Sequence, residues 1–301
     1  MPVANFKEIS SLHGLEFPVS CNDICISSNG RKLLTTGIYK PTVKLFDTKS
    51  GIIKFERHLV SDPLKNFFLD DGEKFAILRN DKTIEFHVKG GLHEKIRTIK
   101  QPQDVSLNKF VAELYIGGNF NEINRFSLEQ GRFLKSITCS GATRISFSEI
   151  NTLLAASFKN NITFIDTRTR NEIFQKQYDD ETVSICQDAS GLKYLVGFET
   201  GKLFEYDLRS PKSLREIELK SFAIKACYAG KFITVSTQKQ IYFIDELTDK
   251  IEECSLIHPG FIINTFCIDG GIAFVGGENQ AIKTYICEDF GKVPEWVYDR
   301  S

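Results

Sequence analysis

The sequence predicts an all-β fold, a seven-bladed β-propeller whose blades are four-stranded antiparallel sheets. The first observation behind this prediction is a repeat. The segment Lys40-Pro41-Thr42-Val43-Lys44-Leu45-Phe46-Asp47 has the alternation of one short strand, and similar segments return about every forty residues until the end of the chain. Such a period, with about four short strands in each copy, is typical of propeller blades.

The second observation is the pair of residues that ends each copy. Aligned on Val43, the copies place at the same position Ile84, Ile123, Ile162, Leu203, Ile241 and Ile282. A large apolar side chain follows in every copy, namely Phe46, Phe86, Phe126, Ile165, Tyr206, Ile244 and Tyr285. The next residue is Asp47, Asp166, Asp207 or Asp245 in four copies and His87, Ser127 or Ile286 in the others. An aromatic-aspartate pair ending a third strand indicates blades of WD type, and we expect the seven apolar side chains to be buried between blades.

The strands follow from the same pattern along the chain. Blade one is expected to have strands at 24–26, 32–36, 42–47 and 52–56, and blade two at 67–69, 75–78, 83–87 and 95–99. Blades three to six are expected over 105–137, 143–177, 183–218 and 224–255, with blade seven starting near Asn264. Turn residues such as Ser28-Asn29-Gly30 separate the strands within a blade.

Blade seven has no obvious fourth strand. After Ile286 only residues 287–301 follow, so the outer strand is either 293–298 or is donated by the N-terminal segment, residues 1–20. Seven blades of about forty residues leave no room for a second domain. We therefore expect one propeller domain over residues 1–301, with residues 288–301 as a short C-terminal extension.

Composition excludes some function classes. A formal net charge of -1 argues against a uniformly basic nucleic-acid binder, although it allows a local basic patch. No run of eighteen apolar residues and no apolar leader occurs, so we expect a soluble intracellular protein without a membrane partner. The eight cysteines fall singly, and Cys21 and Cys25 lack the second pair that a zinc site needs. They are interpreted as reduced thiols, and no metal or cofactor is expected.

The sequence offers no set of residues for catalysis. The five histidines are scattered, and His87, at the position of the blade-end aspartates, is interpreted as a hydrogen-bonding residue. Gly117-Gly118 and Gly276-Gly277 each end an apolar strand rather than open a helix, so they are not phosphate loops. The run Asp179-Asp180-Glu181 is interpreted as a solvated linker. We expect no enzyme and no small-molecule substrate; a propeller hydrolase would need an acidic or histidine set in a central channel.

Cations gather in the loops after the third strands. They are Lys49, Lys89, Arg132, Arg168, Arg170, Arg209 and Lys212. Loops between first and second strands lie on the same side of a blade, which adds Arg31 and Lys32, whereas the linkers on the opposite side carry both signs of charge. Two interpretations of this basic rim stay open. It is either a solvated surface or a surface for RNA or an acidic partner.

The turn at Tyr39-Lys40-Pro41 is a second candidate surface. An aromatic side chain beside a cation on a loop suits a protein or RNA contact. The alternative is that Tyr39 packs on the next blade.

Specific words in the sequence resemble one family. They are Thr36-Gly37-Ile38-Tyr39-Lys40-Pro41, the stretch from Leu45-Phe46-Asp47 to Lys54-Phe55-Glu56-Arg57, Asn80-Asp81-Lys82-Thr83-Ile84-Glu85-Phe86-His87, Leu128-Glu129-Gln130-Gly131-Arg132-Phe133-Leu134, Tyr206-Asp207-Leu208-Arg209-Ser210 and Pro294-Glu295-Trp296. In order and spacing they look like the nucleolar WD-repeat family called nucleolar protein ten or, in fungi, essential nuclear protein two.

The resemblance implies a non-catalytic scaffold of the small-subunit processome, which acts in maturation of small-subunit ribosomal RNA in the nucleolus and nucleus. It implies processome proteins as partners and leaves direct contact with pre-ribosomal RNA open. The candidate partner residues are Tyr39, Lys40, Pro41, Arg57, Arg132, Arg168, Arg170, Arg209 and Lys212. Family members continue into a charged C-terminal region, and with the sequence ending at Ser301 we expect its contacts to be absent or moved to the propeller. The alternative is a generic WD-repeat adaptor, such as a substrate receptor or a trafficking platform.

Overall fold

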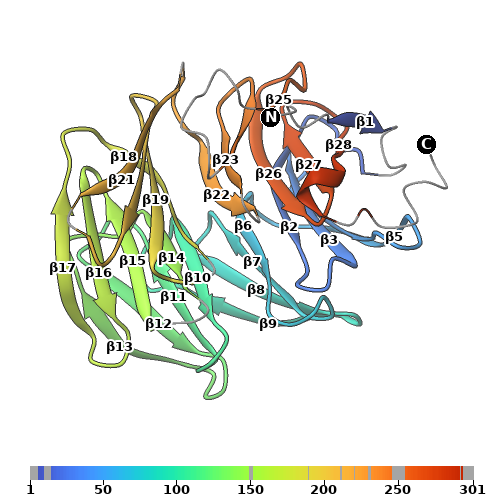
Figure 1. Ribbon diagram of the computed structural model, residues 1–301. Coiled ribbons are helices and arrows are strands. Elements are labelled where there is room, and N and C mark those ends of the chain that lie inside the picture. The colour runs from blue at the N-terminus through green and yellow to red at the C-terminus, as the bar shows by residue number, and fades with distance from the viewer. Residues whose placement is uncertain are drawn as a thin grey trace. The chain divides into compact units, whose positions relative to one another are not determined.

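A computed structural model describes residues 6–9, 15–148, 152–188, 190–210, 212–219, 221–229, 232–245, 255–291 and 293. In these residues the chain forms seven four-stranded antiparallel sheets and one short 3-10 turn, Glu288–Phe290 (Figure 1). This is a seven-bladed β-propeller, as the repeat predicted. No helix in the described part is long and apolar enough to cross a membrane.

The strands of each blade follow one another along the chain. The strands of blades one and two are β2 (Ser20–Ile26), β3 (Lys32–Ile38), β4 (Thr42–Asp47), β5 (Ile52–His58), β6 (Pro63–Phe68), β7 (Phe75–Arg79), β8 (Thr83–Val88) and β9 (Gly91–Arg97). Blades three and four are β10 (Asp104–Asn108), β11 (Glu113–Gly117), β12 (Glu122–Ser127), β13 (Arg132–Thr138), β14 (Arg144–Phe147), β15 (Leu153–Phe158), β16 (Asn161–Asp166) and β17 (Asn171–Gln177). Blades five to seven are β18 (Thr182–Gln187), β19 (Lys193–Phe198), β20 (Lys202–Asp207), β21 (Ser213–Glu218), β22 (Lys225–Ala229), β23 (Phe232–Ser236), β24 (Ile241–Asp245), β25 (Ser255–Ile257), β26 (Ile263–Asp269), β27 (Ile272–Gly277) and β28 (Lys283–Ile286).

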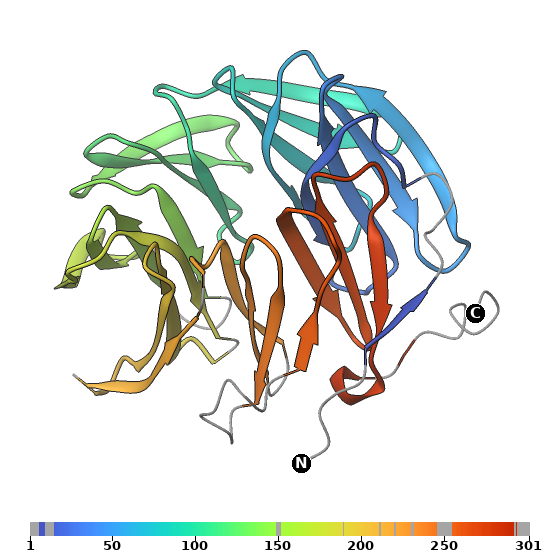
Figure 2. The same cartoon turned by 90° about the horizontal axis from the view of Figure 1, so that it is seen from above.

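The fourth strand of blade seven comes from the start of the chain. β1 (Lys7–Ile9) pairs antiparallel with β28, with Lys7 opposite Ile286 and Ile9 opposite Thr284. Figures 1 and 2 both show this strand beside β28. The alternative outer strand was residues 293–298. Residues 294–298 lie outside the described residues, and Val293 is buried in the apolar core beside this blade.

The chain divides into two compact units, one of residues 1–97, 229–232 and 238–301 and the other of residues 98–228 and 233–237. In the first unit, Ile9, Cys21, Leu33, Phe46 and Phe274 share one apolar core between blades seven and one. In the second, Tyr115, Ile123, Leu154 and Ile165 share a core between blades three and four. The seven apolar side chains that end the third strands are all buried, none of them more than 7 % exposed. Sheet faces therefore pack on neighbouring blades, as the fold requires.

A hydrogen bond recurs between the inner strands of adjacent blades. Asp23 Oδ2 accepts from the N–H of Asn66 at 2.8 Å, and Asp104 Oδ2 accepts from the N–H of Ile145 at 2.8 Å. Between blades four and five, Ser146 Oγ accepts from the N–H of Gln187 at 3.0 Å. These side chains satisfy backbone donors that the antiparallel ladder leaves unpaired, so they tie one blade to the next.

Blade two departs from the predicted strand limits. Its first strand, predicted at 67–69, begins at Pro63, and its last, predicted at 95–99, ends at Arg97. Proline is tolerated at the first residue of a strand. Asn66 interrupts the apolar pattern but is buried, because its amide donates to the Asp23 carbonyl and to Thr36 Oγ1 at 3.1 Å each. The apolar pattern could not reveal a buried polar residue whose side-chain NH2 group is hydrogen-bonded to the neighbouring blade.

The predicted position of His87 was wrong by one residue. A register shift between the third and fourth strands falls just before Phe46 in blade one, Ile165 in blade four and Tyr206 in blade five. In blade two it falls just before His87, so His87 corresponds to Phe46, and Val88 corresponds to Asp47. The imidazole stacks on the Phe75 ring with centroids 5.0 Å apart and fills the aromatic slot. An alignment that required an apolar residue there selected Phe86 instead.

Two of the paired glycines have a packing role. Gly117 ends β11, and a Cβ there would collide with the carbonyl of Ala142 in the next blade. Gly276 lies in β27, where a Cβ would come within 2.8 Å of Cys21 Sγ. Glycine is required because the first strand of the next blade approaches so closely.

The described cysteines are free thiols in packed surroundings. Cys21, Cys139 and Cys287 are buried, and Cys25, Cys186, Cys227 and Cys267 are partly buried, whereas Cys254 lies outside the described residues. Burial raises the pKa of the Cys21 and Cys139 thiols above the ordinary value. Both therefore behave as small apolar groups.

Candidate functional site

The residue that ends a third strand organises the turn after it. Asp47 Oδ1 accepts from the N–H groups of Lys49 and Ser50 at 3.1 and 3.2 Å, and Asp166 Oδ1 accepts from the N–H of Arg168 at 2.9 Å. In blade three, Ser127 Oγ accepts from the N–H of Gln130 at 3.1 Å in the same way. The recurring aspartate is thus a local acceptor that holds the turn.

Blades one, three and four share one five-residue turn at this place. Its fifth residue donates its N–H to the carbonyl of the first, from Gly51 to Asp47 at 2.8 Å, from Gly131 to Ser127 at 2.9 Å and from Arg170 to Asp166 at 2.7 Å. The fifth residue is left-handed in each case, with φ of 65° for the two glycines and 62° for Arg170. Blade four therefore carries an arginine where the matching turns carry glycine.

Two of the predicted rim cations are held by their own blade-end aspartates. Arg168 Nη2 lies 3.5 Å from Asp166 Oδ2, and Arg209 Nη2 lies 2.6 Å from Asp207 Oδ2. Hydrogen bonds from the side chain and then the backbone N–H of Arg209 lower the pKa of Asp207 to about 2. The backbone N–H of Arg168 likewise lowers the pKa of Asp166. The pairing neutralises part of the charge that the sequence assigned to the rim.

The other rim candidates are exposed. Arg132 Nε donates to Gln130 Oε1 at 2.8 Å, and Lys212 closes a small turn with Ser210, whose Oγ accepts from its N–H at 3.3 Å. Within the described residues, no ion pair is formed by Arg132, Lys212 or Arg170. These three side chains keep their charge available at the surface.

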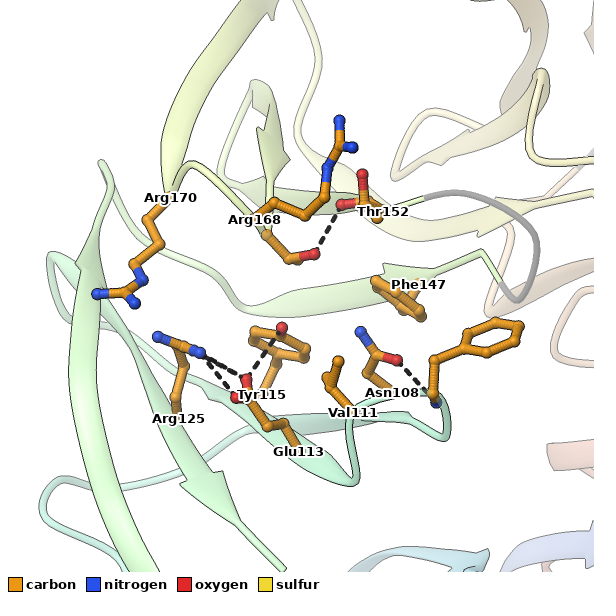
Figure 3. A pocket seen from close by; sticks show the side chains of 11 residues that line it. Asn108, Val111, Glu113, Tyr115, Arg125, Phe147, Thr152, Arg168 and Arg170 are labelled. Carbon is orange, nitrogen blue, oxygen red and sulfur yellow. Dashed lines mark hydrogen bonds and ion pairs between the residues drawn. The ribbon is translucent and has the colours of Figure 1, made fainter.

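Arg168 and Arg170 also line a pocket between blades three and four, with a volume of about 390 Å³ (Figure 3). The other lining residues come from the first hairpin turn and third strand of blade three and from the neighbouring ends of blade four; they are Asn108, Phe110, Val111, Glu113, Tyr115, Arg125, Phe147, Thr152 and Thr167. A hollow of this size is at the small end of the range that holds small ligands.

The floor of the pocket is polar and internally bonded. Arg125 makes a bidentate ion pair with Glu113, with Nε 3.0 Å from Oε2 and Nη2 2.8 Å from Oε1. The Tyr115 hydroxyl donates to Glu113 Oε2 at 3.2 Å. Burial, and then the Glu113 charge, raise the pKa of Tyr115, so the phenol stays protonated. Because Arg125 and Glu113 satisfy each other, the charge open to a ligand comes from the rim arginines.

The mouth of the pocket also carries apolar and aromatic side chains. Phe110 is 75 % exposed, Val111 is exposed and Phe147 is half-buried. Figure 3 shows Arg170 on one side of the hollow and Phe147 on the other, with the Tyr115 ring between them. The site thus combines cations, free aromatic surface and hydroxyl groups.

Arg57 contacts the neighbouring blade rather than solvent alone. Its guanidinium lies 4.0 Å from the centre of the Phe55 ring, and its Nη1 lies 3.1 Å from His87 Nδ1. Its Nη2 reaches the carbonyls of Val88 and Lys89 at 3.4 and 3.3 Å. Arginine can only donate, so His87 Nδ1 is the acceptor and its Nε2 carries the proton, 3.2 Å from Glu85 Oε2. The geometry gives Arg57 a role in joining blades one and two.

Tyr39, Lys40 and Pro41 lie together in the turn between β3 and β4. Tyr39 and Lys40 both have positive φ, 59° and 81°, in a turn geometry that favours asparagine and glycine. Tyr39 is 68 % exposed, so it does not pack on the next blade. Two consecutive non-glycine residues in this conformation mark the turn as a candidate contact site.

A family model described as the N-terminal domain of nucleolar protein 10-like proteins, a β-propeller, matches residues 4–298. The chain belongs to this family. Ribosome biogenesis protein ENP2 of Saccharomyces cerevisiae is 31 % identical over 96 % of this chain and 44 % of its own length. Nucleolar protein 10 of Mus musculus is 32 % identical and that of Homo sapiens 28 %, each over 96 % of this chain and 45 % of its own length. The chain spans less than half the length of these relatives.

The family resemblance predicted from the sequence is confirmed, but that resemblance did not lead to the pocket. Phe110, Tyr115 and Phe147 were not among the predicted site residues of this nucleolar protein 10-like chain. One signal was present, since Phe110-Val111 places two apolar residues in a hairpin turn, where polar residues are usual. Nothing in the sequence indicated that Tyr115 and Arg125 line a pocket, because both lie in strands whose residues are predicted to be buried in the core.

Proposed function

We propose that this chain is a propeller that acts in ribosome biogenesis, as a non-catalytic scaffold of the small-subunit processome in the maturation of small-subunit ribosomal RNA. The observation that carries the proposal is the family match over residues 4–298, together with relatives named for ribosome biogenesis and for the nucleolus. The names of these relatives indicate a location in the nucleolus and nucleus.

The buried charges support a scaffold. Glu205, 1 % exposed, lies 3.4 Å from Arg215 and 3.7 Å from Lys193, and it accepts from the Tyr228 hydroxyl at 3.3 Å. The Glu113–Arg125 pair in blade three is closed in the same manner. Groups held in mutual ion pairs stabilise and orient strands, whereas a catalytic acid or base must be able to reach a reacting atom.

The partners in this proposal are processome proteins, with pre-ribosomal RNA as a direct contact. The turn Tyr39-Lys40-Pro41 and the exposed cations Arg132, Arg168, Arg170, Arg209 and Lys212 are the proposed contact residues. Arg57 is the weakest of the set, because its guanidinium is already bonded within blades one and two.

The test is purification of the tagged full-length protein from cells, with sequencing of the RNA that accompanies it and imaging of its location. The proposal expects nucleolar signal and enrichment of the small-subunit ribosomal RNA precursor, and it expects this precursor to accumulate when the protein is depleted. Normal precursor maturation after depletion would contradict it. Protein partners without precursor RNA would favour a generic WD-repeat adaptor instead.

A further inference from the structure

The fifth residue of the blade-four turn departs from the internal rule of the repeat. The matching residues of blades one and three are Gly51 and Gly131. Arg170 has the same left-handed backbone conformation, although it carries a side chain. Glycine adopts this conformation without the steric cost that a Cβ brings. Ala112, between the pocket residues Val111 and Glu113, is a second left-handed residue at the same pocket, with φ of 50°. Such backbone outliers concentrate at functional sites.

The side chains at the pocket mouth fit one kind of ligand. Arg170 forms no ion pair with any described residue. Arg168 contacts Asp166, but its side chain is still 74 % exposed. No aromatic ring among the described residues packs on Phe110. A cationic rim with free aromatic faces is how proteins bind single-stranded nucleic acid, with phosphates on the cations and bases on the rings.

We infer that this pocket binds a nucleotide of single-stranded RNA, with the phosphate at Arg170 and Arg168 and the base stacked on Phe110 or Phe147. The inference rests on the proposed function, because it names the RNA contact of that scaffold. The half-buried Thr152 hydroxyl lies at the same pocket and can bond to a base edge or to the ribose 2′-hydroxyl.

Two other occupants fit less well. A base in a duplex is stacked and paired, so it cannot enter a hollow of about 390 Å³, whereas an unpaired base can turn out of its strand. The carboxylates of an acidic peptide would bond to the arginines but would make no use of an open ring face such as that of Phe110. The observations therefore favour unpaired RNA over both.

The experiment is fluorescence anisotropy of the full-length protein with labelled single-stranded RNAs of about ten nucleotides, a length within the range of known single-strand sites. Arg170→Gly and Phe110→Ser are each expected to weaken binding by about tenfold, the scale of losing one stacked base or one phosphate contact. The salt dependence should also become shallower in Arg170→Gly, by roughly 0.7 in the log-log slope. Arg170→Gly removes the strained conformation, so its thermal midpoint should be unchanged or higher.

Lys49→Ala is the matched control, since Lys49 is an exposed cation in the corresponding turn of blade one and is not among the residues that line the pocket. It should leave binding unchanged. Equal losses in Lys49→Ala and Arg170→Gly would overturn the inference in favour of diffuse charge. Equal or tighter binding of a glutamate-rich peptide containing phenylalanine, lost in the same variants, would overturn it in favour of an acidic protein partner.

A second readout does not depend on folding of the variants. RNA carrying 4-thiouridine should crosslink, on irradiation, to the peptide that contains Phe110, and crosslinks confined to other peptides would overturn the assignment. The inference and the proposed function fail separately. If Arg170→Gly co-purifies undiminished precursor RNA from cells and still binds RNA normally in vitro, the pocket is excluded while the scaffold stands.

Discussion

The turns after the third strands of blades three and four have the same backbone and different chemistry. Each second residue donates to the carbonyl of a first hairpin turn, from Leu128 to Ala112 at 2.8 Å and from Thr167 to Thr152 at 3.0 Å. Each closes on a left-handed fifth residue, which is Gly131 in one and Arg170 in the other. In a repeat protein one blade is a structural control for the next, so a departure from the shared pattern identifies a side chain retained for another reason.

The comparison also separates paired from available charge. Asp47 in blade one binds two lysines, with Lys32 Nζ 2.9 Å and Lys54 Nζ 3.2 Å from Oδ2. Among the described residues, Asp166 in blade four forms an ion pair with Arg168 alone, and Arg170 forms none. A count of cations on loops treats these turns alike. Their geometry shows that the blade-one carboxylate is paired with two lysines, whereas the blade-four carboxylate is paired with Arg168 and not with Arg170.

The largest expected effect concerns the strands beneath the turns, which both blades need equally. Phe126→Ala should lower the free energy of unfolding by ~3–5 kcal/mol, because it empties a buried site beside Phe133, whose ring centre is 5.1 Å away. Lys49→Ala, at the exposed turn of blade one, should cost under ~0.5 kcal/mol. Urea denaturation measures both, and equal costs would contradict the burial assigned to the third strands.

The acceptor at the first turn position should matter next. Asp166→Ala removes the acceptor for the Arg168 N–H and should cost ~1–2 kcal/mol of unfolding free energy, whereas Ser127→Ala in blade three should cost ~0.5–1 kcal/mol. The carboxylate is the stronger acceptor because it is charged. A Ser127→Ala variant less stable than Asp166→Ala would show that the turns are held by other contacts.

Exchange of the fifth residues tests the comparison directly. Gly131→Arg should cost ~1 kcal/mol through the left-handed backbone alone, since a Cβ at Gly131 meets no atom within 4 Å. Arg170→Gly should change stability by ~0–1 kcal/mol in the opposite direction, the relief of strain being offset by the freedom that glycine gives the unfolded chain. Thermal denaturation of the two variants and the double exchange measures this. A clear destabilisation by Arg170→Gly would mean that the arginine side chain stabilises the fold.

The smallest expected effect is a pH dependence of stability from Asp207, which ends the third strand of blade five. The blade-three turn begins with Ser127, which has no carboxylate, and cannot show this effect. Arg209 lowers the pKa of Asp207 to about 2, so the carboxylate form is favoured in the folded state. Its stabilising contribution should be complete above the ordinary aspartate pKa of about 3.9 and should be lost as the pH falls to about 2. The difference in denaturation midpoint between the wild type and Asp207→Asn should therefore close over this range. A gap that stays constant with pH would exclude the Arg209 contact as its cause.

The sequence by itself determined the repeat, through the repeat the fold, and through its specific words the family. A period near forty and a buried residue at each third-strand end are local properties, because a blade is one contiguous segment and its strands pair with sequence neighbours. The turn at Tyr39 and Lys40 could also be identified from the sequence as a candidate contact site. An aromatic residue and a lysine occupy positions where a hairpin turn favours glycine or asparagine.

Tertiary structure decided what the residues at the blade ends do. The place of His87 depended on a register shift between two strands, and the division of the rim into bound and free cations depended on side-chain reach across a turn. The pocket required residues about forty positions apart, such as Phe110 and Thr152, to meet between adjacent blades. Periodicity specifies which residues are equivalent, but contacts between blades depend on the shape of each loop, and shape is not a property of spacing alone.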